Sequence, residues 1–377
     1  MGRIAVRDLA ETAAPHIEIV VADRDVAEGR RIARALRGRV RSVAADAASP
    51  GSLARALHRA TVVVNACHHD FNLRVMEGAL RAGVHYCDLG GLFHVTRRQL
   101  RRDAAFRRAG LLAICGIGSA PGIVNVMARD AADRLDRVTE IHIAVGTRDA
   151  TPKRGAGLLE TSYSIETVLD EASQPAALFT RGALSFVEPL SRAEPVRFAA
   201  PVGLQHPACT LHSELATLPA SFASKGIREV SFRIAFPGDL AERLRFLHAL
   251  GLTSRDAVAV RGGKVVPREL LLALLARRPR PVAAGARDEY EVLRVTVRGR
   301  RGRRAVEEIM ECHVPGMPAW DVGVDIDTGA PPSIVAQMLV AGAIDATGVR
   351  PPEQAVPPAP FFHELTRRGM RITRRRR

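Results

Sequence analysis

Short apolar strands alternate with helical segments over the first 115 residues, and this alternation constrains the fold more than any other feature. Five runs rich in β-branched residues have strand length, at 17–22, 40–44, 61–65, 84–87 and 111–115. The segments between these runs carry apolar residues at helical spacing. Parallel strands need crossover connections, so the pattern predicts a parallel sheet with helices on both faces. We therefore expect an α/β fold of the doubly wound, Rossmann type.

Polar or glycine residues follow the predicted strands, where a doubly wound sheet binds its ligands. Asp23 could accept the ribose hydroxyls of NAD and would repel the 2′-phosphate of NADP, although Arg24 favours that phosphate. NAD is thus the expected cofactor and NADP the alternative. Each residue alone could be a helix N-cap or part of a tight turn, but their recurrence at successive strand ends favours a dinucleotide site. The candidate cofactor-binding residues are Gly2, Asp23, Arg24, Asp46, Ala47, Asn65, Ala66, Cys67, Asp88, Gly90 and Gly118.

The usual glycine loop of a dinucleotide fold is not found before the first predicted helix. A first strand and a G-x-G-x-x-G loop normally precede that helix, and their backbone amides bind the pyrophosphate. Here Met1-Gly2-Arg3 leads directly into helical spacing, and Gly2 fits the last glycine of the motif. We expect a misplaced start, with an apolar strand ending in Gly-x-Gly encoded upstream. A real loss of this segment would abolish tight NAD binding.

The second half of the sequence predicts a different architecture. A helix after Pro121-Gly122 leads into a strand at 138–145, and a hairpin is expected from 290–297 and 306–314. Longer strands and fewer crossovers indicate an α+β domain with an antiparallel sheet. We expect a cofactor domain over 1–120, a substrate and dimerisation domain over 121–329, and C-terminal helices over 330–377 that return to the first domain.

Six segments in combination resemble the saccharopine dehydrogenase family, and within it the lysine 6-dehydrogenase-like members. The segments are VVVNACHHDFN (62–72), GVHYCDLGG (83–91), GIGSAPGIVNVMA (116–128), TLHSELATLP (210–219), GAPPSIVAQMLVAGAI (329–344) and GVRPPEQAVPP (348–358). The resemblance implies an NAD(P)-dependent oxidoreductase acting on the CH–NH group of an amino acid, with hydride leaving Cε of lysine. A saccharopine or carboxynorspermidine-type dehydrogenase is one alternative. A non-catalytic binding protein that has lost the cofactor loop is another.

A small amino-acid substrate is expected between the two domains. Removal of hydride from an amine needs a group that takes the amine proton, and Glu214, His212 and Asp70 are the catalytic candidates. Two of the candidates have plainer explanations, because His68-His69-Asp70 could be a solvated turn and Asn125 a backbone cap. The candidate substrate-binding residues are Asn72, His94, Asn125, Thr210 and Ser213.

The net charge of +15 taken alone would suggest a nucleic-acid or membrane partner. Of the 55 basic residues three are lysine and therefore 52 are arginine, which is typical of a GC-rich genome. Arginines cluster only at 298–304, a predicted hairpin turn, and at 374–377, a terminus expected to fray. Nucleic-acid binding is accordingly not expected. The five cysteines lie far apart without metal-ligand spacing, so we expect no metal and a reducing cytoplasm. No apolar stretch is long enough for a membrane helix, and a homodimer is the default expectation.

Overall fold

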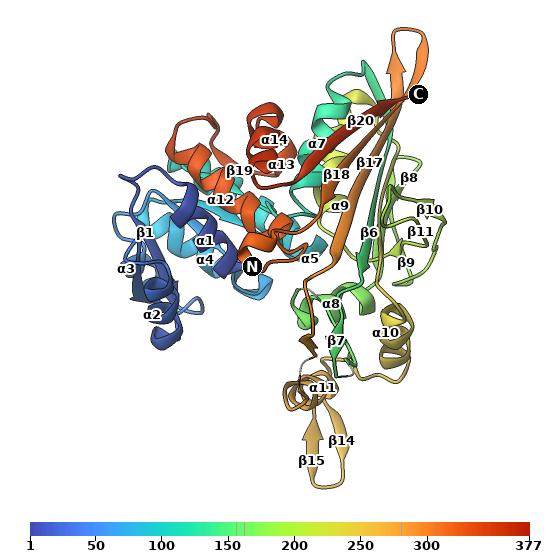
Figure 1. The fold of residues 1–377 in the computed structure, drawn as a ribbon. Helices are drawn as coiled ribbons and strands as arrows, with labels where there is room; N and C mark the ends of the chain where they lie inside the picture. Colours follow the sequence, from blue (N-terminus) through green and yellow to red (C-terminus); the bar gives the residue numbers. More distant parts are fainter. Residues whose placement is uncertain (156, 162, 280) are drawn as a thin grey trace.

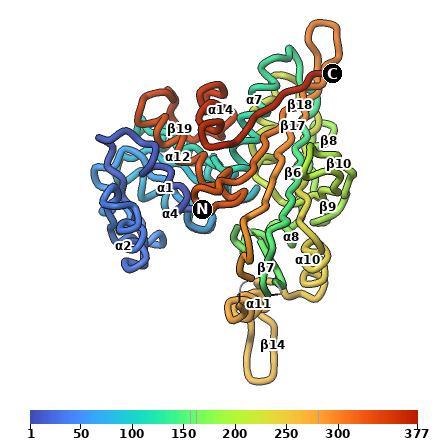
Figure 2. The backbone as a smooth tube through the Cα atoms, viewed as in Figure 1, coloured from blue at the N-terminus to red at the C-terminus, as the bar shows by residue number. Residues whose placement is uncertain are grey.

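The computed structural model describes residues 1–155, 157–161, 163–279 and 281–377. It has an N-terminal part built on parallel strands and a second part built on a large, mostly antiparallel sheet (Figures 1 and 2). The expected α/β fold with a second domain is confirmed. The two parts meet beside α5 (Leu92–Leu100) and α9 (Glu214–Ser221), whose residues contact each other.

The N-terminal part alternates strands and helices as the sequence predicts. Asp25 caps α2 by accepting from the amide of Ala27 at 2.9 Å, and Ser49 caps α3 by accepting from Ser52 at 3.2 Å. Two short helices, α5 and α6, connect β4 to β5. The elements are α1 (Gly2–Thr12), β1 (Ile19–Asp23), α2 (Val26–Ala35), β2 (Val40–Ala44), α3 (Pro50–Ala56), β3 (Val62–Asn65), η1 (His69–Phe71), α4 (Asn72–Ala82), β4 (His85–Asp88), α5 (Leu92–Leu100), α6 (Asp103–Arg108) and β5 (Leu112–Ile114).

The parallel strands form two separate sheets. One is the pair β1–β2, and the other has the order β19–β5–β4–β3. Within the described residues no ladder joins β1 to β3. In the strand order of a dinucleotide-binding sheet, the position between them belongs to the strand that precedes α1. Gly2 at the start of α1 lies beside Ala66 after β3, since a Cβ on Gly2 would be 3.2 Å from that of Ala66.

The second part is centred on an eight-stranded sheet in which the long hairpin β17–β18 pairs with β6 and β20. Helix α7 packs on this sheet against β6, β17 and β18. Its strands are β6 (Arg137–Asp149), β8 (Ala176–Thr180), β9 (Ala183–Val187), β12 (Ala208–Cys209), β13 (Glu229–Ala235), β17 (Glu289–Arg301), β18 (Arg304–Val314) and β20 (Arg371–Arg376). The other elements before residue 326 are α7 (Ile123–Ala132), β7 (Lys153–Arg154), α8 (Ile165–Ser173), β10 (Val196–Arg197), β11 (Leu204–Gln205), α9 (Glu214–Ser221), η2 (Ala223–Lys225), α10 (Leu240–Ala249), β14 (Val258–Val260), β15 (Gly263–Val265), α11 (Pro267–Ala276), β16 (Val282–Ala283) and η3 (Pro318–Trp320).

The C-terminal segment returns to the N-terminal part before it ends in the large sheet. Its elements are α12 (Ile326–Val340), β19 (Gly348–Arg350), α13 (Pro352–Ala355), α14 (Pro358–Arg367) and β20. Helix α12 packs against α1 and β3, and β19 pairs in parallel with β5.

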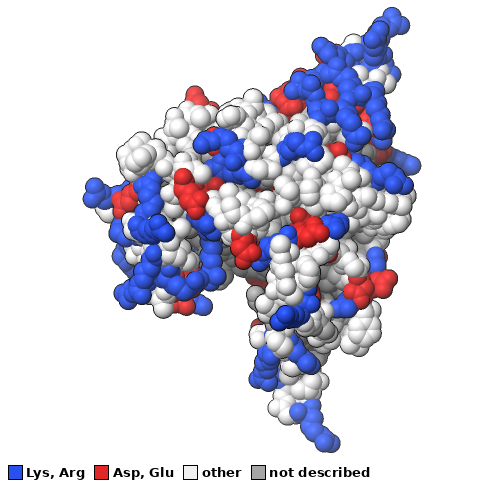
Figure 3. Space-filling model, in the orientation of Figure 1, with Lys and Arg blue, Asp and Glu red and all other residues white. Residues whose placement is uncertain are grey.

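The expectation that 374–377 frays was wrong for most of that run, because Arg374–Arg376 belong to β20 and pair with β18. Strand β20 and the β17–β18 hairpin thereby bring the two arginine clusters side by side at one end of the molecule (Figure 3). Several of these arginines pair with carboxylates, as Arg375 does with Glu311 at 3.3 Å. None of the helices in the described residues has both the length and the apolar character needed to span a bilayer.

Candidate active site between the two domains

The start of α1 provides free backbone donors at the cofactor edge. No side chain caps this helix, so its first amides are available to an anion such as a pyrophosphate. A larger side chain at Gly2 would crowd Ala66, which would have to shift by a few tenths of an ångström. Asp23 lies at the end of β1, where its carboxylate accepts from the amide of Asp25 at 2.8 Å. These residues fit a dinucleotide, with the ribose near Asp23 and the phosphates near α1.

Asp88 at the end of β4 is saturated by the protein itself. Its carboxylate accepts from the amides of Gly90 (2.9 Å) and Gly116 (2.7 Å). It also accepts from the Tyr86 hydroxyl at 2.7 Å and from Gln99 at 2.6 Å. Burial raises the pKa of Asp88, and these four donors oppose that rise. Asp88 therefore holds the strand ends in place and has little capacity left for a ligand.

Two predicted substrate-binding residues, Asn72 and Asn125, are also held by hydrogen bonds within the protein. Asn72 is buried, donates to the Gly90 carbonyl at 3.0 Å and accepts from Asn65 at 2.8 Å. Asn125 accepts from the amide of Gly122 at 3.0 Å and donates to Glu353 at 2.9 Å. Both side chains thus organise the loops around the site. The plainer explanation considered for Asn125, a backbone cap, agrees with these contacts.

The loop 116–122 between β5 and α7 requires glycine for its close packing. Gly122 has φ 135°, and a Cβ there would lie 2.0 Å from the Gly118 carbonyl oxygen. A Cβ on Gly90 would lie 2.8 Å from Pro121 and 3.8 Å from the Ser213 hydroxyl. This contact places the segment 210–214 of the second part directly against the strand ends of the first.

A buried acidic cluster lies behind this junction. Glu214 begins α9, and its Oε2 is 3.2 Å from Nδ1 of His212, whose Nε2 is 3.4 Å from Oε1 of Glu171 on α8. The Tyr163 hydroxyl donates to Oε2 of Glu171 at 2.5 Å, and the His212 ring stacks on Phe232. Burial alone would lower the pKa of His212, but the charges of Glu214 and Glu171 raise it to about 10. His212 is therefore an imidazolium held between two carboxylates at neutral pH.

Four polar atoms of segment 210–214 are buried without a well-formed hydrogen bond. They are the hydroxyls of Thr210 and Ser213, Nε2 of His212 and Oε1 of Glu214. Nε2 of His212 still faces Glu171, so the other three are the unpaired ones. Buried polar atoms without partners are rare, and in enzymes they often await a ligand.

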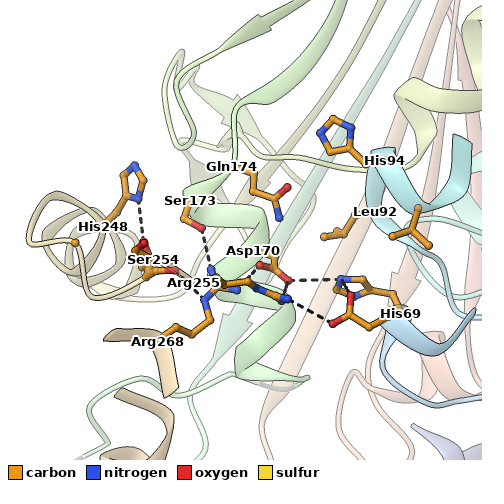
Figure 4. A pocket seen from close by; sticks show the side chains of 14 residues that line it. His69, Leu92, His94, Asp170, Ser173, Gln174, His248, Ser254, Arg255 and Arg268 are labelled. Carbon is orange, nitrogen blue, oxygen red and sulfur yellow. Dashed lines mark hydrogen bonds and ion pairs between the residues drawn. The ribbon is translucent and has the colours of Figure 1, made fainter. Parts of the chain in front are cut away.

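A pocket of about 550 Å³ opens between the two parts, beside α8 (Figure 4). His69 and His94 line it from the first part, and Arg255 and Arg268 from the second. Asp170 is central, because Arg268 donates to its Oδ1, Arg255 donates to its Oδ2 at 2.9 Å and His69 lies 3.5 Å away. These hydrogen bonds outweigh burial and lower the pKa of Asp170 to about 2.

Asp70 lies at the rim of this pocket and is half exposed, with Arg255 3.4 Å away. His68, His69 and Asp70 present atoms within 4.8 Å of one another, a spacing that a metal ion could bridge. The guanidinium of Arg255 already neutralises Asp70, however, and we assign no metal there. The remaining predicted residues lie at the cofactor edge, where Arg24 and Cys67 are exposed and Asp46 and Ala47 are partly buried.

Sequence reasoning missed four residues of the junction, which are Tyr163, Glu171, Glu291 and Asp327. Glu171 and Asp327 lie in helices, where a carboxylate usually faces solvent, and Glu291 lies in a strand that alternates polar and apolar residues. Only the adjacent pair Asp170-Glu171 inside an otherwise apolar helical face gave a signal. Asp70 and Glu214, both catalytic candidates from the sequence, belong to separate groups of contacts.

A dinucleotide-binding sheet, a second α+β domain and a charged pocket at their junction define a nicotinamide-dependent oxidoreductase. Residues 1–114 match the saccharopine dehydrogenase NADP binding domain, and residues 118–370 match the saccharopine dehydrogenase C-terminal domain. The chain belongs to the saccharopine dehydrogenase family. It is thus an NAD(P)-dependent dehydrogenase that acts on the CH–NH group of amine or amino-acid substrates.

Two relatives cover nearly the whole chain. A carboxyaminopropylagmatine dehydrogenase from Synechocystis sp. is 24% identical over an alignment of 370 residues, and the match covers 94% of this chain and 90% of that protein. The structure of apo saccharopine dehydrogenase (L-Glu forming) from Saccharomyces cerevisiae superposes with a TM-score of 0.74. It is 17% identical, and the match covers 100% of this chain and 98% of that one. This likeness shows a shared fold over both domains.

Proposed function

We propose that the chain oxidises a secondary amine that joins an amino-acid part to a second, cationic part. The buried acidic cluster carries this proposal. Glu171 and Glu214 flank a single imidazolium, so with both carboxylates ionised the cluster has one unbalanced negative charge. A buried charge needs a partner, and a substrate ammonium would supply it.

The cluster also provides a proton acceptor. The substrate nitrogen arrives protonated and has to lose that proton before its neighbouring carbon can give up hydride. Oε1 of Glu214 is buried without a hydrogen-bond partner, which suits it to accept the proton. His212 is already protonated and would orient Glu214 and stabilise its charge. When bound, NAD(P)+ accepts the hydride; the iminium left behind adds water and splits into a carbonyl compound and an amine.

The pocket beside α8 suits the carboxyl-bearing part of such a substrate. Arg255 is half exposed within it, and His69 and His94 are further donors. Asp170 on the pocket side and Glu171 on the cluster side are adjacent in α8, so one extended molecule could contact both. Oxidation of lysine at Cε is the second candidate function, because the acidic cluster also suits its ε-ammonium.

A substrate panel tests the proposal. The full chain would be mixed with NAD+ or NADP+ and with lysine, saccharopine, carboxynorspermidine or carboxyaminopropylagmatine, and reduced nicotinamide would be followed by absorbance. We expect turnover with one of the secondary amines and little with lysine. Turnover with lysine alone would replace the proposal by the second candidate. Failure with every amine, in a chain shown by calorimetry to bind the dinucleotide, would reject both.

A further inference from the structure

A second pair of carboxyl groups lies at the domain junction, apart from the His212 cluster. Glu291 is on β17, in the centre of the large sheet, and Asp327 is in the first turn of α12, which packs against α1 and β3. The Thr147 hydroxyl donates to Oε2 of Glu291 at 2.7 Å, and the Thr328 hydroxyl donates to Oδ1 of Asp327 at 3.1 Å. The pair therefore connects the substrate domain with the helix that covers the cofactor domain.

No cationic side chain of the described residues balances this pair. Within 4.0 Å, neither Glu291 nor Asp327 has a Lys, Arg or His partner; Arg287 pairs with Glu289 and Asp321 instead. Asp327 is 2% exposed, and its Oδ2 has no hydrogen-bond donor. Two adjacent carboxyls cannot both ionise without a cation, so the free pair shares a proton. The groups facing the pair are Ser119, Thr147, Tyr163, Glu289, Cys312 and Thr328.

The pair adjoins the acidic cluster through Tyr163. Burial and then the charge of Glu171 raise the pKa of Tyr163, and the charge of Glu291 contributes to the same rise. Since the Tyr163 hydroxyl donates to Glu171, one phenol is near both acidic groups. Glu291 and Tyr163 are partly exposed, whereas Glu171 and Asp327 are buried.

We propose that Glu291 and Asp327 bind a second cationic group of the substrate, an ammonium or guanidinium, in exchange for the proton that they share. The inference rests on the proposed function, in which the reacting amine lies at Glu171 and Glu214. Burial and mutual repulsion raise the pKa values of both members of the pair. Affinity for the cation should consequently rise with pH. The rise should end at the pH at which the free pair loses its shared proton even without a ligand.

Titration calorimetry of the full chain tests the exchange without turnover. The probes are agmatine, putrescine and butylamine, each measured in two buffers of different ionisation enthalpy. The wild type should release about one proton on binding agmatine or putrescine and none on binding butylamine. Agmatine carries a guanidinium and putrescine a second ammonium, so their relative affinities distinguish the two cations.

Two variants separate charge from structure. Glu291→Gln keeps the shape and removes one of the two carboxyl groups, so its affinity for agmatine should fall while its affinity for butylamine stays unchanged. The double variant E291Q/D327N should bind agmatine roughly 10- to 100-fold more weakly. Glu353→Gln is the matched control, since Glu353 is a buried carboxyl hydrogen-bonded to Asn125 and Ser221; it should leave affinity and proton release unchanged.

Equal affinity for agmatine in the wild type and E291Q, or no proton release by the wild type, would overturn the inference. This comparison still decides if the double variant does not fold. The fate of the proposed function is read separately, from the substrate panel. Absence of turnover together with proton release on agmatine binding would reject the function and keep the site. Turnover with an unchanged KM in E291Q/D327N would keep the function and reject the site.

Discussion

His212 shows at the scale of one residue how environment decides a role. The sequence made it a catalytic candidate on the basis of its loop, as if its imidazole were free to accept a proton. Its position between Glu171 and Glu214 raises its pKa to about 10. Each ring nitrogen faces one of the two carboxylates. The imidazolium therefore balances the charge of one of the two carboxylates, and we assign the role of proton acceptor to Glu214.

Replacing His212 by glutamine should destabilise the chain by about 3–5 kcal/mol, because two buried carboxylates lose their cation. A group whose pKa is higher in the folded state stabilises fully below its unfolded pKa of about 6.5 and loses that effect as pH rises through about 10. The stability gap between wild type and H212Q should therefore narrow with pH. Urea unfolding at about pH 6, 8 and 10 measures it, with exposed His16→Gln as control; a gap that widens would contradict the assignment.

Replacing Glu214 by glutamine should lower kcat by about 10²–10⁴ if its Oε1 accepts the substrate proton. Glu188→Gln, at a residue outside the cluster, is the control and should behave as the wild type. A change in KM alone would show that Glu214 binds substrate without taking its proton.

Element packing explains why the C-terminal segment returns to α1. Arg368, directly after α14, donates to Asp8 of α1 at 2.6 and 2.8 Å, and Ser333 of α12 donates to the same carboxylate. Asp8 is fully buried and Arg368 nearly so. In the sequence Asp8 is a polar residue at helical spacing, and such residues usually face solvent. Nothing local indicates its partner 360 residues away.

Arg368→Ala should cost about 3–5 kcal/mol of unfolding free energy, because Asp8 would be left buried and charged. The neighbouring Arg367 pairs with Glu364 at the surface, so Arg367→Ala should cost less than about 1 kcal/mol. Thermal or chemical unfolding of the two variants side by side gives the comparison. Equal losses would mean that the buried pair adds nothing beyond a surface pair.

At the scale of the whole molecule, one apolar core joins the two domains. It runs from Ile114 of the cofactor sheet through α7 to Val295 of the large sheet and Phe361 of α14. The β1–β2 pair instead packs with α1 and α2 in a small separate cluster. The domains predicted as separate ranges thus share a core, while the outer strand pair depends on little packing.

Hydrogen exchange should reveal this difference. Amides of β1, α2 and β2 should exchange faster than those of β4, β6 and β17, because regions with few buried contacts open at lower free energy. Exchange followed by mass spectrometry on the full chain, alone and with NADP+, provides the measurement. Protection of β1 and β2 equal to that of β17 would show that the pair is part of the main cooperative unit.

The sequence by itself determined most of the elements and predicted the edge at which a ligand should bind. Hydrophobic periodicity and local caps such as Ser49-Pro50 act over a few residues, so they can be read without the fold. Only the tertiary structure decided which polar side chains are consumed by the protein and which are left for a ligand. Asp88 and Asn125 each have one hydrogen-bond partner distant in sequence, Gly116 and Glu353, whereas Glu171, Glu291 and Asp327 come to the junction from three separate segments. Charge balance in a buried site depends on that convergence, which no local pattern records.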